Sequence, residues 1–117
     1  MVQYQPPPLD TAFAALADAT RRGVVEQLAR DEASISTLAR RFDLTLTGMR
    51  KHVSVLEAAG LVVSEKQGRV RRCRLSGRGL DAAAEWIAAQ RALWTARFDA
   101  LDTLVDRLKQ EQDDASQ

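Results

Sequence analysis

The sequence has very little of the chemistry on which enzymes and metal sites depend. Its 117 residues include one cysteine, Cys73, and one histidine, His52. A single cysteine cannot form an internal disulfide, so we expect a protein of the reducing cytoplasm. One histidine and one distant cysteine provide neither a nucleophile–base pair nor a tetrahedral metal site, and the sequence has no glycine-rich phosphate loop. We therefore predict a protein that is not an enzyme and has no metal and no cofactor.

Long apolar runs are absent too. No stretch approaches the roughly eighteen consecutive apolar residues of a membrane-spanning helix. The first residues, MVQYQPPPLD, have neither the basic start nor the apolar segment of a signal peptide. We expect one small globular domain with a modest core and no membrane partner.

The charge is concentrated in one part of the chain. The net charge of +1 is the sum of −2 over residues 1–18, +2 over 19–60, +5 over 61–78 and −4 over 79–117. A nearly neutral chain with one basic segment suggests a local anion-binding surface, and nucleic acid is the leading candidate. A solvated charged face is the alternative that charge alone leaves open.

Apolar residues recur at helical spacing in four segments before residue 61. A proline run, Pro6–Pro8, precedes the first, and we expect it to stay extended and not to continue into a helix. Asp18 or Thr20 is expected to cap the second helix, Ser34 the third and Thr45 the fourth. The expected apolar faces are Leu9, Phe13 and Leu16; Val24, Val25 and Leu28; Ile35, Leu38, Ala39 and Phe42; and Met49, Val53 and Leu56.

The third and fourth helices have the pattern of a helix-turn-helix motif. The tight connection FDLT joins them, and the fourth helix is expected to run to about Ala59 and to stop at Gly60. A short helix, a tight turn and a second helix with a polar outer face match that motif. The outward side of the fourth helix carries Thr47, Arg50, Lys51 and Ser54.

A basic hairpin follows the fourth helix. Val62 and Val63 favour one strand, Gly68 a turn, and residues 70–75 the return strand. A two-stranded ribbon is marginal alone, so it must pack on the helices, and a basic hairpin directly after such a helix is a wing. We expect Cys73 to be a small core residue. A redox switch, with neighbouring arginines lowering the pKa of its thiol, is the alternative.

The outward residues fit the major groove of duplex DNA, where each base pair presents its own donors and acceptors. Arg50 can pair with guanine O6 and N7, and Lys51 can reach the same acceptors or a phosphate. Thr47, Gly48 and Ser54 are small enough for close approach of the helix. The N–H groups around Thr45 suit a phosphate. The wing arginines expected to follow the backbone or the minor groove are Arg69, Arg71 and Arg72.

Three stretches together resemble the ArsR family of winged helix-turn-helix repressors. They are LADATRRGVVEQLA, STLARRFDLTLTGMRKHVSVLEAAGLV and GRVRRCRL, and the likeness covers residues 9–76. It implies a dimeric operator-binding protein, usually a repressor that controls its own operon. By position it implies DNA contacts from Thr47, Gly48, Arg50, Lys51, His52 and Arg69. Arg50 replaces the family's usual serine and Val53 its leucine, so the family's operator preference does not transfer.

The metal-sensing signatures of that family are missing here. The stretch SISTLARRF has no cysteine, and the C-terminal helix has no histidine. The resemblance is therefore to the branch without the metal-site cysteines, and we expect metal-independent binding. Asp99, Asp102 and Asp106 are interpreted as a solvated flank of the helix.

A long C-terminal helix is expected over roughly residues 79–111. Leu80, Ile87, Trp94, Leu101 and Leu108 recur at intervals of seven, which indicates a helical partner. Packing against the chain's own first helix would leave part of this stripe exposed, so we favour a homodimer, in which two recognition helices would read an inverted repeat. The expected interface consists of Phe13, Ile87, Trp94, Phe98, Leu101, Val105 and Leu108.

The sequence thus predicts a mostly helical fold with a small β-wing, a winged helix-turn-helix with a long dimerisation helix. The expected regions are a proline-rich arm (1–8), the DNA-binding domain (9–76), the dimerisation helix (77–111) and a polar tail (112–117). A protein-interaction module is the alternative from another class of function. A small-molecule effector is unknown: Trp86, Trp94 and Phe98 could line an apolar pocket for one, but as core and interface residues they need no ligand, and we favour that interpretation.

Overall fold

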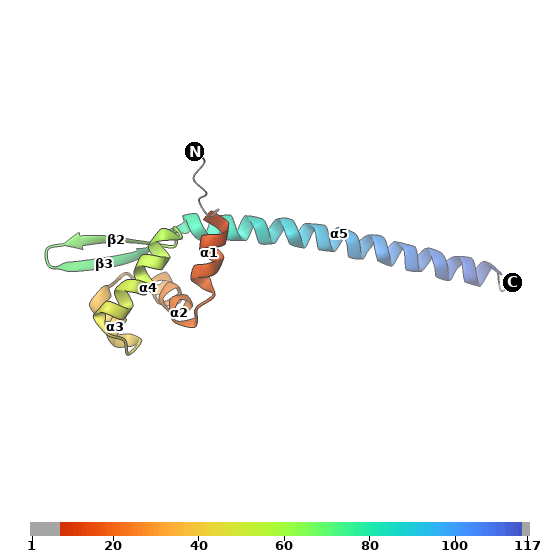
Figure 1. Cartoon of the computed structure of the whole chain (residues 1–117). Helices are drawn as coiled ribbons and strands as arrows, with labels where there is room; N and C mark the ends of the chain where they lie inside the picture. Colours follow the sequence, from red (N-terminus) through yellow and green to blue (C-terminus); the bar gives the residue numbers. More distant parts are fainter. Residues whose placement is uncertain (1–7, 116–117) are drawn as a thin grey trace, which may run out of the picture. The chain divides into compact units, whose positions relative to one another are not determined.

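The computed structural model describes residues 8–115, which form helices and a small sheet (Figure 1). The elements are α1 (Pro8–Leu16), α2 (Ala19–Arg30), β1 (Ala33–Ser34), α3 (Ile35–Arg41), α4 (Leu46–Ala58), β2 (Val62–Gln67), β3 (Val70–Leu75) and α5 (Gly77–Ala115). The chain divides into two compact units, residues 1–83 and 84–117, so the boundary lies inside α5. The second unit is the rest of α5, a single helix with no core of its own.

Side-chain caps start three of the helices where the sequence predicts them. Asp18 caps α2, which decides between the two candidates, while Ser34 caps α3 and Thr45 caps α4. Each cap oxygen accepts a backbone N–H of the first turn that has no partner within the helix. The bonds are Arg21 N to Asp18 Oδ2 at 3.0 Å, Thr37 N to Ser34 Oγ at 3.1 Å and Gly48 N to Thr45 Oγ1 at 3.0 Å.

The start of α1 differs from the expectation. Pro8 is its first residue, so the proline run does continue into a helix. Proline is well tolerated at this position, because its missing N–H would have no partner in the first turn and its fixed φ suits a helix. The rest of the arm predicted over residues 1–8 lies outside the described residues.

A tight turn joins α3 to α4. Asp43 has a φ of 54°, in the left-handed region, and the N–H of Leu44 donates to the carbonyl of Ala39 at 2.8 Å. Aspartate tolerates this backbone conformation better than most residues. The turn completes the predicted helix-turn-helix.

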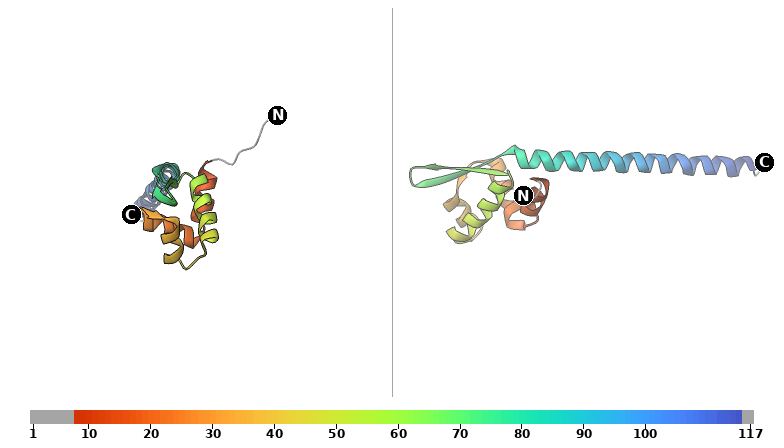
Figure 2. Two further views of the ribbon diagram at one scale, coloured as in Figure 1. Left: turned by 90° about the vertical axis from the view of Figure 1, so that its left-hand side faces the viewer. Right: turned by 45° about the horizontal axis from the view of Figure 1, so that its top comes forward.

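The wing has one strand more than the sequence predicts. The sheet order is β1-β3-β2, with both pairs antiparallel, and Ala33 of β1 lies opposite Cys73 of β3. The expected two-stranded ribbon is thus three-stranded at its base. The sequence did not reveal β1, because two residues are too few to show an alternation of apolar and polar side chains. In Figure 1 and in the right-hand view of Figure 2 the β2–β3 hairpin projects past α4.

One core holds α2, α3, α4 and the base of the wing together. Leu38, Met49, Leu56 and Val53 are buried as predicted, and so is Cys73. Val25 and Phe42, which were also expected inside, are only partly buried and pack against this core, as does Leu75. Because this face of α4 is buried, the opposite face of the helix is exposed.

A close backbone contact holds the first turn of α5 against the end of α4. The N–H of Gly79 donates to the carbonyl of Gly60 at 2.9 Å, and a Cβ at Gly79 would collide with the carbonyl oxygen of Ala59. Gly60 itself has a φ of 72°, as its role as the helix stop requires. The helix α5 thus begins directly after the wing, with its first turn packed against the end of α4.

The long helix extends further than expected at its C-terminal end. α5 has 39 residues, a length of about 58 Å. Residues 112–115 are helical and not a separate polar tail, and Gln110 Nε2 donates to Asp114 Oδ1 at 3.4 Å across one turn. Among these residues, Gln112 and Ala115 have good helix propensity. In the described residues, no helix is long and apolar enough to cross a membrane.

Candidate nucleic-acid interface

An open cleft of about 790 Å³ separates the outer face of α4 from the wing. Ile35 and Val53, both buried, form its apolar floor. Arg50 and Ser54 line it from α4, while Arg69 and Arg71 line it from the wing, as predicted. Lys66 adds a further cation, and Glu57 is the single carboxylate among the lining residues. The cleft is therefore basic, and it lies where a recognition helix and a wing would flank a DNA backbone.

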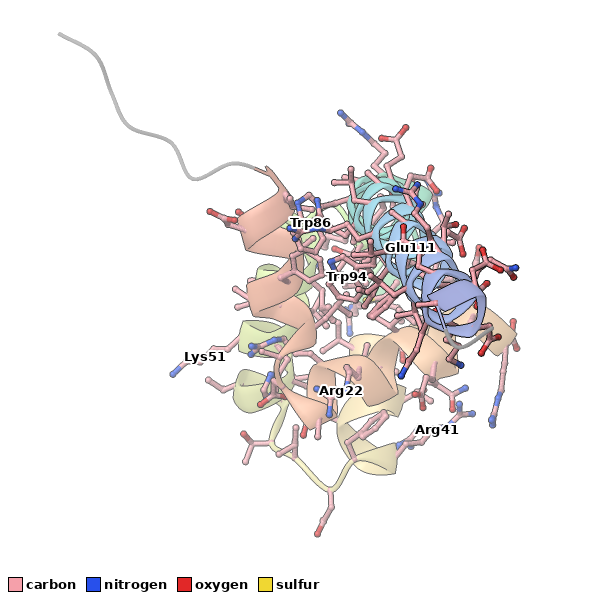
Figure 3. All side chains as sticks on the ribbon, turned by 90° about the vertical axis from the view of Figure 1, so that its right-hand side faces the viewer. Arg22, Arg41, Lys51, Trp86, Trp94 and Glu111 are labelled. Atoms are coloured by element: carbon pink, nitrogen blue, oxygen red, sulfur yellow. The ribbon has the colours of Figure 1, made fainter. Side chains whose placement is uncertain are left out.

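Four of the predicted α4 residues lie outside the lining of the cleft: Thr47, Gly48, Lys51 and His52. Thr47 and Lys51 are both exposed, and Lys51 projects outward from α4 (Figure 3). At the start of the same helix, the hydroxyl of the N-cap Thr45 accepts a hydrogen bond from the backbone N–H of Gly48. These residues remain accessible to a ligand that approaches the N-terminal half of α4.

His52 is tied to the protein itself. Its Nδ1 lies 3.4 Å from Arg21 Nη1 and 3.9 Å from Asp18 Oδ2. Arg21 in turn donates from Nε to the carbonyl of Ala15 at 2.7 Å and from Nη2 to that of Ala14 at 3.1 Å. The hydrogen bond from the backbone N–H of Arg21 is the main reason why the pKa of Asp18 is lowered. This cluster braces α4 against the α1–α2 corner, and sequence reasoning missed it because its members are far apart in the chain.

A chain of hydrogen bonds also links α4 to the wing. Ser64 Oγ donates to Glu57 Oε1 at 2.7 Å, and Arg71 Nη1 donates to Ser64 Oγ at 3.0 Å. Arg71 thus has a protein partner within the cleft that it lines. The position of the wing over α4 depends partly on this chain.

Arg72 lies apart from the other two predicted wing arginines. It lines a separate small hollow of about 80 Å³ together with Glu32, Glu65 and Arg74. Arg74 is paired with Glu65 at 3.3 Å. Successive side chains of a strand point to opposite faces, which separates Arg71 from Arg72 on β3, so the structure does not bring Arg72 to the main cleft.

Cys73 is fully buried, and burial raises the pKa of its thiol to about 11. Arg71 acts in the opposite direction but is outweighed. The expectation that nearby arginines could lower this pKa is therefore wrong, because the low polarity around the sulfur disfavours a charged thiolate. Cys73 has the properties of a core residue.

Comparisons with known proteins agree with this arrangement. A family model described as a helix-turn-helix domain matches residues 16–65. The chain is 33% identical over 106 residues to the HTH-type transcriptional regulator Rv2034 of Mycobacterium tuberculosis, which covers 91% of this chain and 94% of that protein. A crystal structure of the ArsR family transcriptional regulator RHA00566 is 43% identical, with a TM-score of 0.72, over 81% of this chain and 97% of that one. The chain belongs to the ArsR family of helix-turn-helix transcriptional regulators.

The fold of this ArsR-family regulator is a winged helix-turn-helix. The solution structure of the homodimeric winged helix-turn-helix domain of Mb0332 from Mycobacterium bovis matches it with a TM-score of 0.58 at 21% identity, over 78% of this chain and 82% of that one. α3 and α4 form the motif, α4 is the recognition helix, and β2 and β3 form the wing. The fold class and the family inferred from the sequence are thus confirmed.

Five exposed residues of the cleft were absent from the sequence prediction: Ser36, Leu46, Glu57, Lys66 and Val70. Leu46 lines the cleft one helical turn before Arg50, yet 41% of it is exposed. Its position directly after the N-cap and four residues before Arg50, which the sequence predicts to contact a base, was the available signal. An apolar residue at that point does not match a search for polar DNA contacts.

Proposed function

We propose that this ArsR-family regulator is a repressor that binds an inverted-repeat operator in duplex DNA as a homodimer and controls its own operon. The observation that carries the proposal is the basic cleft between α4 and the wing, in which Arg50, Arg69 and Arg71 converge. Arg50 would read a guanine, Lys51 and the wing cations would contact phosphates, and Thr47 and Ser54 would allow close approach. Gly48 and His52, carried over from the family resemblance, complete the candidate recognition helix.

The structure modifies two of these roles. Because His52 is held by Arg21 and Asp18, we propose that it orients α4 and reaches DNA only from its exposed edge. Because Arg72 lies outside the main cleft, it would contact only DNA that wraps past the wing. Arg69, which no described hydrogen bond engages in the structure between residues 8 and 115, is the wing residue best placed for the backbone.

We further propose that α5 makes the dimer. Between residues 84 and 115 its large apolar side chains are exposed, and Trp94, Phe98, Leu101, Val105 and Leu108 are separated alternately by four and three residues. This spacing is the seam of a two-helix packing. Trp94, Phe98 and Leu101 also line an open apolar groove of about 490 Å³ that a partner helix would fill. The Mycobacterium bovis domain of the same fold is a homodimer.

A binding experiment with the operator region tests the proposal. The full chain would be titrated onto the promoter fragment upstream of its own gene and onto random duplex, in a series of salt concentrations. If each subunit engages about four phosphates, the log–log salt slope would be on the order of −7. Equal affinity for the promoter fragment and for random duplex would contradict operator binding. It would favour the alternative in which the α5 stripe engages a different protein.

Metal independence is a separate part of the proposal. In the part of the chain that the structure describes, no group of three or more histidine, cysteine or acidic residues could hold a metal ion. We predict that zinc, cadmium and arsenite at micromolar concentration leave the DNA complex intact in a mobility-shift assay. Release of DNA by one of them, with loss of the response in Cys73→Ser, would show that the prediction is wrong.

A further inference from the structure

Leu46 presents a large apolar side chain in a cleft whose exposed residues are otherwise polar or charged, apart from Val70 of the wing. It is the first residue of α4, directly after the N-cap, and 41% of it is exposed. Among the described residues, the core cluster and the hydrophobic side chains packed against it do not include Leu46. Burial within this chain therefore does not explain it.

The spacing along α4 places Leu46 with the base-reading residues. Leu46, Arg50 and Ser54 are four residues apart in turn, so they form one row on the helix, and all three line the cleft. Four residues advance a helix by about 6 Å. Base pairs of duplex DNA are about 3.4 Å apart. A side chain one turn before Arg50 therefore lies one or two base pairs from the base that Arg50 contacts.

The chemistry of the major groove then limits the partner of Leu46. Its base edges present hydrogen-bond donors, acceptors and one apolar group, the C5-methyl of thymine. A leucine set against a donor or acceptor would leave that group without its water and without a replacement, which costs free energy. Against a methyl group both partners lose contact with water, which is favourable.

We propose that Leu46 is a specificity-determining residue that packs on the C5-methyl of a thymine one or two base pairs from the base contacted by Arg50. This inference rests on the proposed operator binding and adds a base preference to it. Val70 is the natural comparison, because it lines the same cleft from the wing and is 47% exposed. From the wing, Val70 would pack on sugars and would not distinguish one base from another.

Replacing thymine by deoxyuridine removes only the methyl group and so tests the contact directly. Full-length protein would select its preferred duplex from a random-sequence library, and each thymine of that duplex would then be replaced by deoxyuridine in turn. Affinities would be measured for the unaltered protein and for Leu46→Ala and Val70→Ala. We expect one position in each half-site where deoxyuridine weakens binding of the unaltered protein about fourfold. Leu46→Ala should bind both duplexes equally at that position, whereas Val70→Ala should keep the fourfold preference.

The possible results separate this inference from the function on which it rests. If a duplex is selected but no deoxyuridine substitution matters, or if Leu46→Ala keeps the full preference for thymine, the methyl contact is disproved while operator binding stands. If no duplex is enriched over the random library, both are disproved. Because every comparison is a ratio of two duplexes for one protein, a change in the stability of a variant does not affect it.

Discussion

The described residues up to Ala83 bury a core of large apolar side chains, whereas those from Ala84 onward bury none of theirs. Leu38, Met49 and Leu56 are fully buried in the first unit. In the second, Trp94 is 59% exposed and Phe98 65%. A folded chain tolerates scattered exposed leucines, but a stripe of aromatic and aliphatic residues at heptad spacing is typical of a helix that meets another helix. The first unit thus has a packed core of its own, and the exposed stripe of the second fits the proposed partner helix.

The same contrast explains how charge is used. In the first unit the exposed face of α4 and the wing carry basic side chains that take no part in the core, and these form the candidate DNA surface. In the second unit Asp99, Asp102 and Asp106 flank the apolar stripe. An acidic helix is poorly suited to contact DNA, which supports assigning DNA contact to one unit and chain pairing to the other.

The largest expected effect compares one leucine from each unit. Leu56→Ala should lower the free energy of unfolding by about 2–5 kcal/mol, because it leaves a cavity in the core. Leu93→Ala should change it by less than about 0.5 kcal/mol, because Leu93 is 59% exposed and lies off the heptad stripe. Urea denaturation of the two variants measures both values, and losses of equal size would remove the distinction between the units.

A charge in the stripe should separate the chains. Leu101→Glu should give monomers that keep their helical content and bind the operator about 100-fold more weakly, since each half-site then binds without the effective concentration that a partner provides. Ala100→Glu, one residue away and off the stripe, adds the same charge and should leave dimers intact. Sedimentation velocity and mobility shifts on both variants test this. A dimeric, fully active Leu101→Glu would move the interface elsewhere, most plainly to α1 around Phe13.

Within the first unit, the cleft should be distinguishable from the rest of the surface. Arg50→Ala should weaken operator binding by about 1–3 kcal/mol and relax the preference at one base position. Arg69→Ala should weaken all sequences similarly. Arg40→Ala is the matched control, because Arg40 is exposed on α3 outside the cleft. Competition of operator and random duplexes measures the difference, and equal losses on both duplexes for Arg50→Ala would rule out base reading.

The smallest expected effect concerns the link between α4 and the wing. Glu57→Ala removes the acceptor of Ser64, so the ratio of operator to random affinity should fall about fivefold as the wing loses its fixed position. Random-duplex affinity itself should rise, because a carboxylate has left the cleft. Glu57→Gln removes the charge but keeps an acceptor, and it should retain most of the ratio. An unchanged ratio in Glu57→Ala would mean that the hydrogen-bond chain does not position the wing.

The sequence predicted the elements whose signals are local. Ser34 and Thr45 marked two helix starts correctly, and the spacing of Met49, Val53 and Leu56 identified the buried face of α4. That face determined which residues point outward, so Arg50 and Ser54 could be named before the structure was known. The hairpin around Gly68 was equally clear from its strand formers and turn residue.

The features that the sequence did not predict depend on contacts between distant residues. The strand β1 exists only because Ala33 pairs with Cys73, and the bracing of His52 requires Arg21 and Asp18 to meet it from another helix. The alternative in which neighbouring arginines lower the pKa of Cys73 was not met either, because desolvation of the buried thiol raises this pKa and outweighs Arg71. The C-terminal end of α5 was missed for another reason. The polar residues after 111 suggested a frayed tail, whereas the helix continues to Ala115.

The stoichiometry and footprint of the protein on its selected duplex test most directly whether one unit reads DNA while the other pairs two chains. Sedimentation equilibrium of the complex should find two chains per duplex. Hydroxyl-radical footprinting should show two equivalent protected patches on one face of the duplex, with centres about 34 Å apart, one for each recognition helix. One chain per duplex with a single patch would contradict this division of roles between the two units.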